Sequence, residues 1–382
     1  MRIVHLCLYG PVMDGWNYQD NMLSKYHKVL GHEVTIVASK WVWNKDNKLE
    51  KYDKSDYVNS DGVRVIRLDI KGKKTVLSKF KRYINLEQVL NELHPDVLFI
   101  HNAAYLDIVK VVKYLKNHRS VKVFVDNHND FSNSATNWIS KNLLHKGLWR
   151  VMYKKLNPYT KKFYGVLPAR VDFLTNIYKT PASKTELLVM GADDEKVIEA
   201  NSDNNKQKIR HKWDIGENDI LIVTGGKIDQ FKAQTLLLMQ AVKNINKPGI
   251  KLIVFGSVSP ELRSQVNRLS DGKQVQFIGW IDANQSYEYF AAADLVVFPG
   301  RHSVFWEEVA GIGKPMICKY WDGTTHIDNG GNVKFLYQDS VAEIQEAINE
   351  TINPENYQKM SSIAIENAKK FCYKDIALRC IK

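Results

Sequence analysis

Short apolar runs alternate with longer segments of helical period along the whole chain, and this alternation constrains the fold more than any other feature. Each apolar run ends at a turn signal and leads into a helix-like segment, which is the pattern of parallel α/β layers. The predicted strands cover residues 2–9, 33–39, 63–69, 96–102, 121–128 and 163–168 in the first half, and 219–226, 250–257, 274–280, 294–300 and 314–320 in the second. The length of 382 residues suits two domains. The sequence therefore predicts an α/β protein of two doubly wound, Rossmann-like domains.

A polar stretch near the middle of the chain marks the predicted domain boundary. The segment "ELLVMGADD" at 186–194 is a strand-like run that passes into a turn, and the polar "EKVIEANSDNNKQ" follows it. We place the boundary at about residue 195. This gives an N-terminal domain of residues 1–195 and a C-terminal domain of residues 196–382, whose last helix is an element that can pack back on the N-terminal domain.

The cysteines and the apolar runs indicate the compartment. The four cysteines, Cys7, Cys318, Cys372 and Cys380, have no C-x-x-C spacing, which predicts reduced thiols, a cytoplasmic setting and no zinc site. No run reaches the roughly 18 apolar residues of a membrane span. The opening "MRIVHLCLYG" lacks the length of a signal-peptide core, so we interpret it as a first buried strand.

Positive charge is concentrated in the first half of the chain. Residues 1–190 hold 31 Lys and Arg against 17 Asp and Glu, a net +14, whereas residues 191–382 hold 23 against 25, a net −2. Two basic segments, 71–82 and 141–163, interleave lysines with apolar and aromatic residues. One such segment is usually a solvated helix face over a core-facing stripe. Two in one domain favour contact with an anionic membrane surface. We expect no nucleic-acid partner, because no nucleic-acid-binding motif accompanies them.

Candidate ligand-binding residues of the second half follow the predicted strands, where doubly wound sheets bind their ligands. Lys227 and Lys232 lie on either side of a turn that leads into a helix, and two cations at a helix N-terminus suit a diphosphate. Gly279 and Trp280 end another strand, where a base could stack, although a tryptophan in such a place often only packs.

The segment "RHSVFWEEVAGIGKP" at 301–315 is the strongest candidate of the second half. His302, Ser303 and Val304 precede a helix whose first turns hold Glu307 and Glu308. We predict that Glu308 binds the ligand. Its neighbour Glu307 points about 100° away around a helix, so we interpret it as a solvent-facing or first-turn charge.

The first half offers two further candidates. Gly10 and Gly15 in "YGPVMDGWNYQDN" would let the backbone approach a phosphate or sugar, or they only form a turn. Their spacing is not G-x-G-x-x-G, so the sequence lacks the fingerprint of a nicotinamide dehydrogenase. The strand-end residues of "VFVDNHND" form either a functional group or a polar network that stabilises a loop. The candidates there are Asp126, His128 and Asp130, and His101 is a weaker one.

In their order and spacing these segments resemble the retaining glycosyltransferases of family 4. The resemblance runs from "MRIVHLCLYG" and "LGHEVTIVAS" through "HPDVLFIH", "ELLVMGADD", "GGKIDQFKAQTLLLMQAV", "FIGWID" and "YFAAADLVVFPG" to "EEVAGIGKPMI". It implies the GT-B fold of two facing Rossmann-like domains with an interdomain cleft. The N-terminal domain would bind the acceptor, and the C-terminal domain would bind the nucleotide sugar.

The resemblance also implies a role for each matching residue. Lys227 and Lys232 would bind the donor diphosphate, the turn of residues 302–304 would meet the α-phosphate or the sugar, and Glu308 would bind the ribose. His128 falls at the family's active-site histidine, which touches the donor sugar near the transferred carbon. No metal and no other cofactor is expected, because lysines and a helix N-terminus neutralise the leaving diphosphate in this fold.

One departure from the family pattern concerns a second carboxylate. Gly300 and Arg301 stand where the family has a first glutamate that helps to hold the sugar. Either His302 or the segment "KYWDGTTH" at 319–326 replaces it, or the chain no longer catalyses. We interpret the site as altered but complete, because the lysines, Glu308 and the N-terminal histidine remain together.

The leading hypothesis is a cytoplasmic, metal-independent, retaining hexosyltransferase. It would move a sugar from a UDP-sugar to a saccharide acceptor, such as a lipid-linked glycan, in bacterial capsule or exopolysaccharide biosynthesis. It would act as a peripheral protein at the inner face of the plasma membrane. The alternative is a non-catalytic GT-B protein that binds a glycan or supports a partner transferase.

Overall fold

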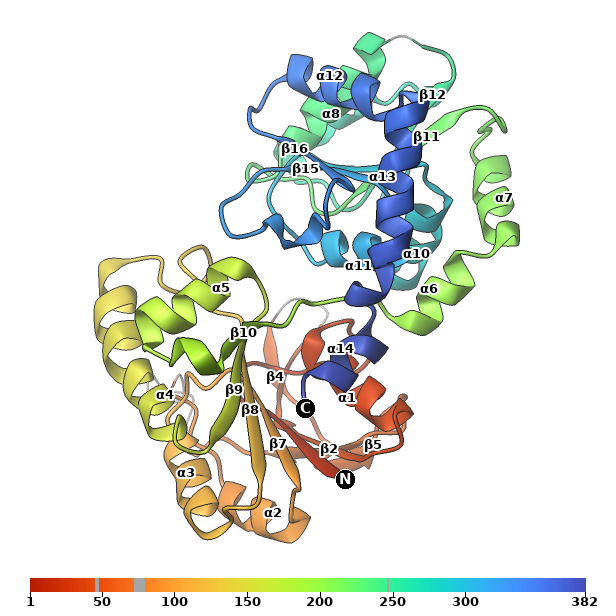
Figure 1. Ribbon diagram of the computed structural model, residues 1–382. Helices are drawn as coiled ribbons and strands as arrows, with labels where there is room; N and C mark the ends of the chain where they lie inside the picture. The colour runs from red at the N-terminus through yellow and green to blue at the C-terminus, as the bar shows by residue number, and fades with distance from the viewer. Residues whose placement is uncertain (45–47, 72–79, 246) are drawn as a thin grey trace. The chain divides into compact units, whose positions relative to one another are not determined.

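The protein folds into two compact units, as seen in a computed structural model that describes residues 1–44, 48–71, 80–245 and 247–382 (Figure 1). Unit 1 comprises Met1–Val189 and Tyr373–Lys382, and unit 2 comprises Met190–Cys372. Of the basic segment at 71–82, residues 72–79 lie outside the described residues. None of the helices in the described ranges is both long and apolar enough to span a membrane.

Unit 1 is built on an eight-stranded sheet with the order β10-β9-β8-β7-β1-β2-β6-β5. Its strands are β1 (Arg2–Cys7), β2 (Glu33–Ser39), β5 (Asp56–Val58), β6 (Arg64–Leu68), β7 (Val97–His101), β8 (Lys122–Asn127), β9 (Thr160–Gly165) and β10 (Thr185–Leu187). Every neighbouring pair is parallel except β5 and β6. The six strands predicted in the first half all form, and the parallel order confirms the predicted fold class.

Helices connect these strands, and β3 (Trp41–Trp43) and β4 (Leu49–Lys51) form a separate two-stranded sheet. The helices of unit 1 are α1 (Gln19–Val29), α2 (Leu86–Leu93), α3 (Ile108–Asn117), η2 (Ser140–Trp149), α4 (Arg150–Leu156), α5 (Pro168–Phe173), η3 (Leu174–Tyr178), η4 (Ala182–Lys184) and α14 (Tyr373–Arg379). Strands β1, β7 and β8 are buried almost throughout, as expected for the middle of a parallel sheet that is covered on both faces.

Unit 2 repeats the design with a six-stranded parallel sheet of order β13-β12-β11-β14-β15-β16. Its strands are β11 (Ile220–Gly225), β12 (Ile250–Phe255), β13 (Val275–Phe277), β14 (Leu295–Phe298), β15 (Met316–Lys319) and β16 (Val333–Leu336). Its helices are α6 (Asp194–Ala200), α7 (Asp203–Lys212), α8 (Gln234–Ile245), η5 (Pro260–Leu262), α9 (Arg263–Leu269), α10 (Ala283–Ala292), α11 (Phe305–Ile312), η6 (Thr325–Ile327), α12 (Val341–Thr351), α13 (Pro354–Asn367) and η7 (Ala368–Phe371). The five strands predicted in the second half all form.

The boundary between the units lies between Val189 and Met190, a few residues before the predicted position of about residue 195. Residue 195 lies inside α6, whose N-terminus is capped by the carboxylate of Asp193. The polar residues that follow position 194 form this helix rather than a linker.

Helix α14 completes the core of unit 1, although more than 180 residues of unit 2 separate it from the rest of that unit in the sequence. It packs on α1, and Figure 1 shows the two helices together. Tyr373, Ile376 and Cys380 are fully buried in one apolar cluster with Leu23 and Tyr26.

The basic segment at 141–163 is arranged differently from the expected membrane-facing patch. Trp149, Met152, Tyr153 and Leu156 are buried in the core of unit 1, so the aromatic and apolar residues of this segment serve mainly for packing. Side chains just before and within its start are exposed instead, with Trp138 at 68%, Ile139 at 61% and Leu143 at 58%.

Candidate functional site

The two predicted diphosphate lysines lie in the loop between β11 and α8 of unit 2. Lys227 is exposed, and its Nζ lies 3.2 Å from the Asp229 carboxylate. Lys232 is half-buried, and burial lowers its pKa. Both therefore stand on one loop at the carboxyl end of a central strand, where an anion can reach them.

The turn after β14 lies against this loop. A Cβ placed on Gly300 would lie 3.3 Å from Gln234 Oε1 and 3.7 Å from Lys232 Cα. The Arg301 guanidinium lies 5.3 Å from the ring centroid of Phe231 and 5.9 Å from that of Trp321. The chain thus brings the lysine loop and the predicted phosphate-binding turn together, although some 70 residues separate them in the sequence.

Glu307 is fully buried, so its interpretation as a solvent-facing charge is wrong. Its Oε1 accepts hydrogen bonds from His302 Nε2 and from His326 Nε2, each at 2.8 Å. Burial alone would raise the pKa of Glu307, but the two imidazoles hold it at about 2. The prediction failed because it treated α11 as half-exposed, whereas every residue of this helix from Trp306 to Ile312 is buried.

The two segments proposed as substitutes for the missing carboxylate meet at Glu307. His302 belongs to the first and His326 to the second. Because the ionised carboxylate only accepts hydrogen bonds, each histidine must carry its proton on Nε2. Glu307 therefore fixes the orientation and the protonated nitrogen of both rings.

Glu308, the predicted ribose ligand, is 2% exposed. Its Oε2 is buried and has no hydrogen-bond partner among the residues that the structure describes. Burial raises the pKa of Glu308 to about 8, against the opposing charge of Lys196. A buried carboxyl oxygen without a partner is costly, and a ligand hydroxyl would satisfy it.

Gly279 and Trp280 follow β13 at the same edge of the sheet. Gly279 has φ = 77°, and its carbonyl oxygen accepts a hydrogen bond from Gly256 N at 2.7 Å. Trp280 is 69% exposed. It does not pack into the core of unit 2, so its ring is free to stack on a planar group.

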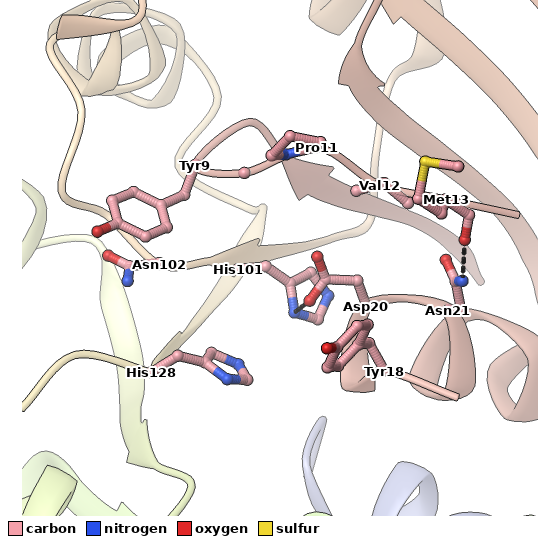
Figure 2. A pocket seen from close by; sticks show the side chains of 11 residues that line it. Tyr9, Pro11, Val12, Met13, Tyr18, Asp20, Asn21, His101, Asn102 and His128 are labelled. Atoms are coloured by element: carbon pink, nitrogen blue, oxygen red, sulfur yellow. Dashed lines mark hydrogen bonds and ion pairs between the residues drawn. The ribbon is translucent and has the colours of Figure 1, made fainter. Parts of the chain in front are cut away.

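Unit 1 contains a cavity of about 180 Å³ beyond the carboxyl ends of its central strands (Figure 2). Its walls come from the loop after β1, the start of α1 and the ends of β7 and β8. The lining residues are Tyr9, Gly10, Pro11, Val12, Met13, Tyr18, Asp20, Asn21, His101, Asn102 and His128. The structure thus places Gly10, His101 and His128 in one pocket, whereas Gly15 lies in a turn with φ = 78° and does not line it.

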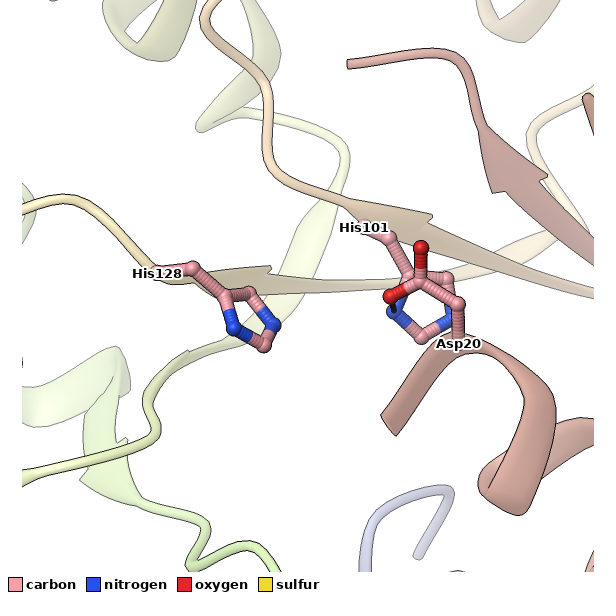
Figure 3. A group of neighbouring side chains, drawn as sticks. All are labelled: Asp20, His101 and His128. Atoms are coloured by element: carbon pink, nitrogen blue, oxygen red, sulfur yellow. Dashed lines mark ion pairs between the residues drawn. The ribbon is translucent and has the colours of Figure 1, made fainter. Parts of the chain in front are cut away.

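A carboxylate and histidine cluster forms one wall of this pocket (Figure 3). Asp126 is fully buried beneath it, and its Oδ2 lies 2.8 Å from His101 Nδ1 and 3.4 Å from His128 Nε2. Asp20 Oδ1 lies 3.3 Å from the same nitrogen of His101. Burial would raise the pKa of Asp126, but the two histidines hold it well below its ordinary value. The carboxylates and imidazoles could act on the hydroxyl groups of a ligand.

Asp130 has a different role from Asp126 and His128, with which it was predicted. Its Oδ2 accepts a hydrogen bond from Arg170 Nε at 3.1 Å, and its Oδ1 accepts one from Ser132 N at 2.7 Å. It does not line the pocket. Asp130 thus belongs to the polar network that stabilises its loop, which is the alternative that the sequence left open.

The sequence reasoning missed Asp20 and Asn102 in this pocket. Asp20 stands in the first turn of α1, directly after the glycine-containing loop, and that position is the signal that could have identified it. Asn102 directly follows His101, has φ = 63°, and its buried Nδ2 finds no partner within the described ranges. An unusual backbone conformation of this kind is not visible in the sequence.

Among the described residues, two clusters contain side chains of the types that bind metals. Asp20, His101 and His128 form one, and His302, Glu307 and His326 form the other, with ligand atoms within 4.8 Å of one another. In each, the carboxylate is already engaged by an imidazole. These contacts account for the side-chain positions without a cation, so neither cluster by itself indicates a metal.

Comparisons with known proteins give one matching family model and several structures of similar fold. Residues 218–353 match the family model of glycosyl transferases group 1. A search of curated protein sequences found no match. Among solved structures, a glycosyltransferase from Rickettsia africae is similar at 14% identity, with a TM-score of 0.66 and coverage of 99% of this chain and 96% of that one.

Two further structures resemble the whole chain. Anabaena HepE in complex with UDP is 17% identical, with a TM-score of 0.67 and coverage of 99% and 98% of the two chains. WaaG, a glycosyltransferase involved in lipopolysaccharide biosynthesis, is 16% identical, with a TM-score of 0.62 and coverage of 99% of each chain. The chain therefore has the GT-B fold of two Rossmann-like domains, and its residues 218–353 match glycosyl transferases group 1.

Proposed function

We propose that this protein is a glycosyltransferase that moves a sugar from a nucleotide sugar to a saccharide acceptor. One observation carries the proposal. The region matched by the glycosyl transferases group 1 model contains the predicted donor-binding residues, which lie in unit 2 on loops that follow its strands and at the start of α11. These residues are Lys227, Lys232, Gly279, Trp280, His302, Ser303, Val304 and Glu308.

The donor we propose is a UDP-sugar. HepE, which shares the fold, has been solved with UDP and with UDP-glucose. Lys227 and Lys232 would neutralise the diphosphate as it leaves, because charge-assisted bonds favour the charge that develops in the transition state. Glu308 would bind the ribose through its unpartnered oxygen.

His302 would replace the missing first carboxylate of the family pattern. Glu307 holds its Nε2–H, so its Nδ1 is the nitrogen left to meet the sugar or the α-phosphate. A histidine that a buried carboxylate orients in this way is pre-organised and needs no rearrangement when the donor binds.

Unit 1 would bind the acceptor in the pocket of Asp20, Asn102 and His128. The further roles that we propose rest on the family resemblance. They are retention of the anomeric configuration, membership of family 4, and a lipid-linked acceptor in the synthesis of a bacterial capsule or exopolysaccharide. The basic first half would hold the protein at the cytoplasmic face of the membrane.

We also propose that the transfer needs no metal or other cofactor, because the two lysines and the start of α8 already supply positive potential at the diphosphate. Activity is expected to be unchanged when EDTA is added. A strict requirement for Mg²⁺ or Mn²⁺ would contradict this part of the proposal.

The test is to incubate the purified full-length chain with a panel of nucleotide sugars and to measure nucleotide release with and without saccharide acceptors. Turnover with one donor that Lys227→Ala with Lys232→Ala abolishes would support the enzyme. Binding of a nucleotide sugar without any turnover across the panel would favour the non-catalytic alternative. The anomeric configuration of the product, read by NMR, would then test retention.

A further inference from the structure

Three histidines of unit 1 form a continuous buried row behind the pocket. His5 of β1 lies between His101 of β7 and His27 of α1, and all three are at most 2% exposed. His5 Nδ1 lies 2.9 Å from His101 Nε2, and His5 Nε2 lies 2.9 Å from His27 Nδ1. Each ring is thus linked to the next by one hydrogen bond.

Both ends of the row meet hydrogen-bond acceptors. At one end, His27 Nε2 lies 3.0 Å from the carbonyl oxygen of Ala377 in α14. At the other end, His101 Nδ1 lies 2.8 Å from Asp126 Oδ2. Because a carbonyl oxygen only accepts, His27 must carry its proton on Nε2 and must accept from His5 through Nδ1.

The proton positions then follow along the row. His5 donates from Nε2, so in its neutral form its Nδ1 accepts from His101 Nε2. His101 therefore has one ring hydrogen committed to His5, and its bond to the Asp126 carboxylate needs another. The row contains four hydrogen bonds and two acceptor ends, whereas three neutral imidazoles supply three hydrogens. One excess proton must be present.

The surrounding groups place this proton on His101 rather than on Asp126. The carboxylate of Asp126 also accepts a hydrogen bond from Asn102 N at 3.1 Å and one from Gln19 Nε2 at 3.4 Å, and these donors favour its ionised form. Asp20 Oδ1 lies 3.3 Å from His101 Nδ1 and adds a second negative charge there.

At the opposite end of the row, the contacts of His27 among the described residues include no carboxylate. His27 faces the Ala377 carbonyl, the Cys380 thiol at 3.6 Å and the His32 ring at 6.2 Å between centroids. Burial lowers the pKa of His27 to about 4 and also lowers that of His5. For His101 burial acts in the same direction, yet Asp126 and Asp20 raise its pKa above the ordinary value.

We propose that His5, His27 and His101 share a single excess proton that resides on His101, and that this buried imidazolium is a positioning group for the pocket of unit 1. It lies against the carboxylates of Asp126 and Asp20, and Asp126 in turn lies 3.4 Å from His128 Nε2. The positioning role rests on the proposed function, in which the pocket of His128 binds the saccharide acceptor. The proton count does not rest on it.

This charge arrangement also limits what the pocket can bind. The Asp20 carboxylate accepts hydrogen bonds and repels anions, whereas Nδ2 of Asn102, which has no partner among the described residues, donates. Paired acceptor and donor groups suit the hydroxyls of a neutral sugar. These groups therefore suit a neutral saccharide as the acceptor end in this pocket.

The direct test is long-range ¹H–¹⁵N NMR of the imidazole rings in the ¹⁵N-labelled full-length protein at neutral pH. We expect His5 and His27 as neutral rings protonated on Nε2, and His101 with both nitrogens protonated. A neutral His101, or a proton on Nδ1 of His27, would overturn the proposal. The wild-type spectrum alone decides, so the test does not depend on any variant folding.

Variants then test whether the charge of Asp126 keeps the second ring proton on His101. Asp126→Asn removes the charge while its amide can donate to His101 Nδ1, so His101 should lose its second ring N–H. His118→Asn is the matched control, because His118 contacts Tyr114 and takes no part in the row. This variant should leave the ring signals of His5, His27 and His101 unchanged. A doubly protonated His101 in Asp126→Asn would contradict the assignment.

A kinetic measurement tests the positioning role separately. With a donor that the protein turns over, His101→Gln should lower kcat and leave the KM for the nucleotide sugar unchanged, since the donor-binding residues lie in unit 2. A raised donor KM with unchanged kcat would reject the positioning role. If no donor is turned over, the proposed function fails while the proton count is still decided by NMR.

Discussion

At the scale of single residues, Glu307 and Glu308 show how neighbours on one helix acquire opposite properties. Both are buried at the start of α11, but only Glu307 has two imidazole partners. Its pKa is held at about 2, whereas burial raises the pKa of Glu308 to about 8. At neutral pH the first is ionised and the second is mostly protonated in the unliganded protein.

These pKa values predict opposite effects of pH on stability. The folded-state pKa of Glu308 lies above its ordinary value of 4.5, so its stabilising contribution is complete below pH 4.5 and is lost as the pH rises through 8. Glu308→Gln removes this loss of folding stability, which in the wild type is at most about 1.4 kcal/mol per pH unit. The Tm of the variant relative to wild type should therefore rise between about pH 5 and about pH 9.

Glu307→Gln is the matched control for that melting series. The depressed pKa of Glu307 contributes stability above pH 4.5 that is lost only as the pH falls through about 2. This variant should be less stable than wild type throughout the same range, with no gain at high pH. Parallel curves for the two variants would contradict the raised pKa of Glu308.

The lysines of unit 2 give a second prediction at this scale. Replacing Lys227 or Lys232 with Ala should weaken UDP binding by about 1.5–3 kcal/mol, the contribution of a hydrogen bond to a charged group. Isothermal titration calorimetry measures the loss. Lys273→Ala is the control, because Lys273 is exposed on a different turn, and it should bind UDP like wild type. Unchanged affinity in both single variants would remove the lysines from the donor site.

At the scale of elements, the segment around η2 combines side chains that are buried in the core with side chains that are exposed. The aromatic residues within 141–163 that suggested a membrane patch are largely core, since Trp149 and Tyr153 are buried. Trp138, Ile139 and Leu143 are exposed instead. Period alone could not distinguish the two sets, because η2 has π-helical hydrogen bonding, which shifts the faces relative to an α-helix.

This segment predicts how the protein meets anionic lipid. Wild type should bind anionic vesicles at low salt and release them at high salt, since each lysine near the surface contributes on the order of 1 kcal/mol and salt screens it. Trp138→Ser with Leu143→Ser should weaken the binding through lost apolar contact. Lys154→Glu with Lys155→Glu should weaken it through charge.

Co-sedimentation with vesicles measures both effects. Ile198→Ser is the control, because Ile198 is comparably exposed but lies in unit 2, and it should sediment like wild type. If wild type ignores anionic vesicles at low salt, the exposed segment is ordinary surface and the acceptor is a soluble saccharide.

The elements also differ in how well the sequence predicted them. The central strands were predictable because strands such as β7 and β8 are apolar on both faces. The three-residue strands β3, β4 and β5 were missed, since so few residues show no alternation. The pocket was only partly predictable. His128 follows a strand, but the contribution of Asp20 depends on how α1 starts beside β7.

At the scale of the whole molecule, unit 1 depends on a helix from the far end of the chain. Ile376 of α14 is fully buried in its core, whereas Leu378 on the same helix is 46% exposed. Ile376→Ala should cost about 2–5 kcal/mol of the free energy of unfolding of unit 1. Leu378→Ala should cost little, and it serves as the control.

Hydrogen exchange followed by mass spectrometry shows where this cost falls. In Ile376→Ala, peptides from α1 and β1 should exchange faster, while peptides from residues 190–372 should exchange as in wild type. Uniformly faster exchange across both units would show that the units do not unfold separately. The sequence predicted two domains but could not show the strength of this link, which depends on the contact between α14 and α1.

The return of α14 to unit 1 has a consequence for the order in which the protein is built on the ribosome. Residues 373–382 are synthesised after every residue of unit 2, so the nascent chain presents the first 189 residues without the helix that closes their core. Unit 2, by contrast, is a single uninterrupted segment and has all its residues earlier. The domain translated first is thus the one that finishes last, and until then its apolar surface at α1 is open to chaperones.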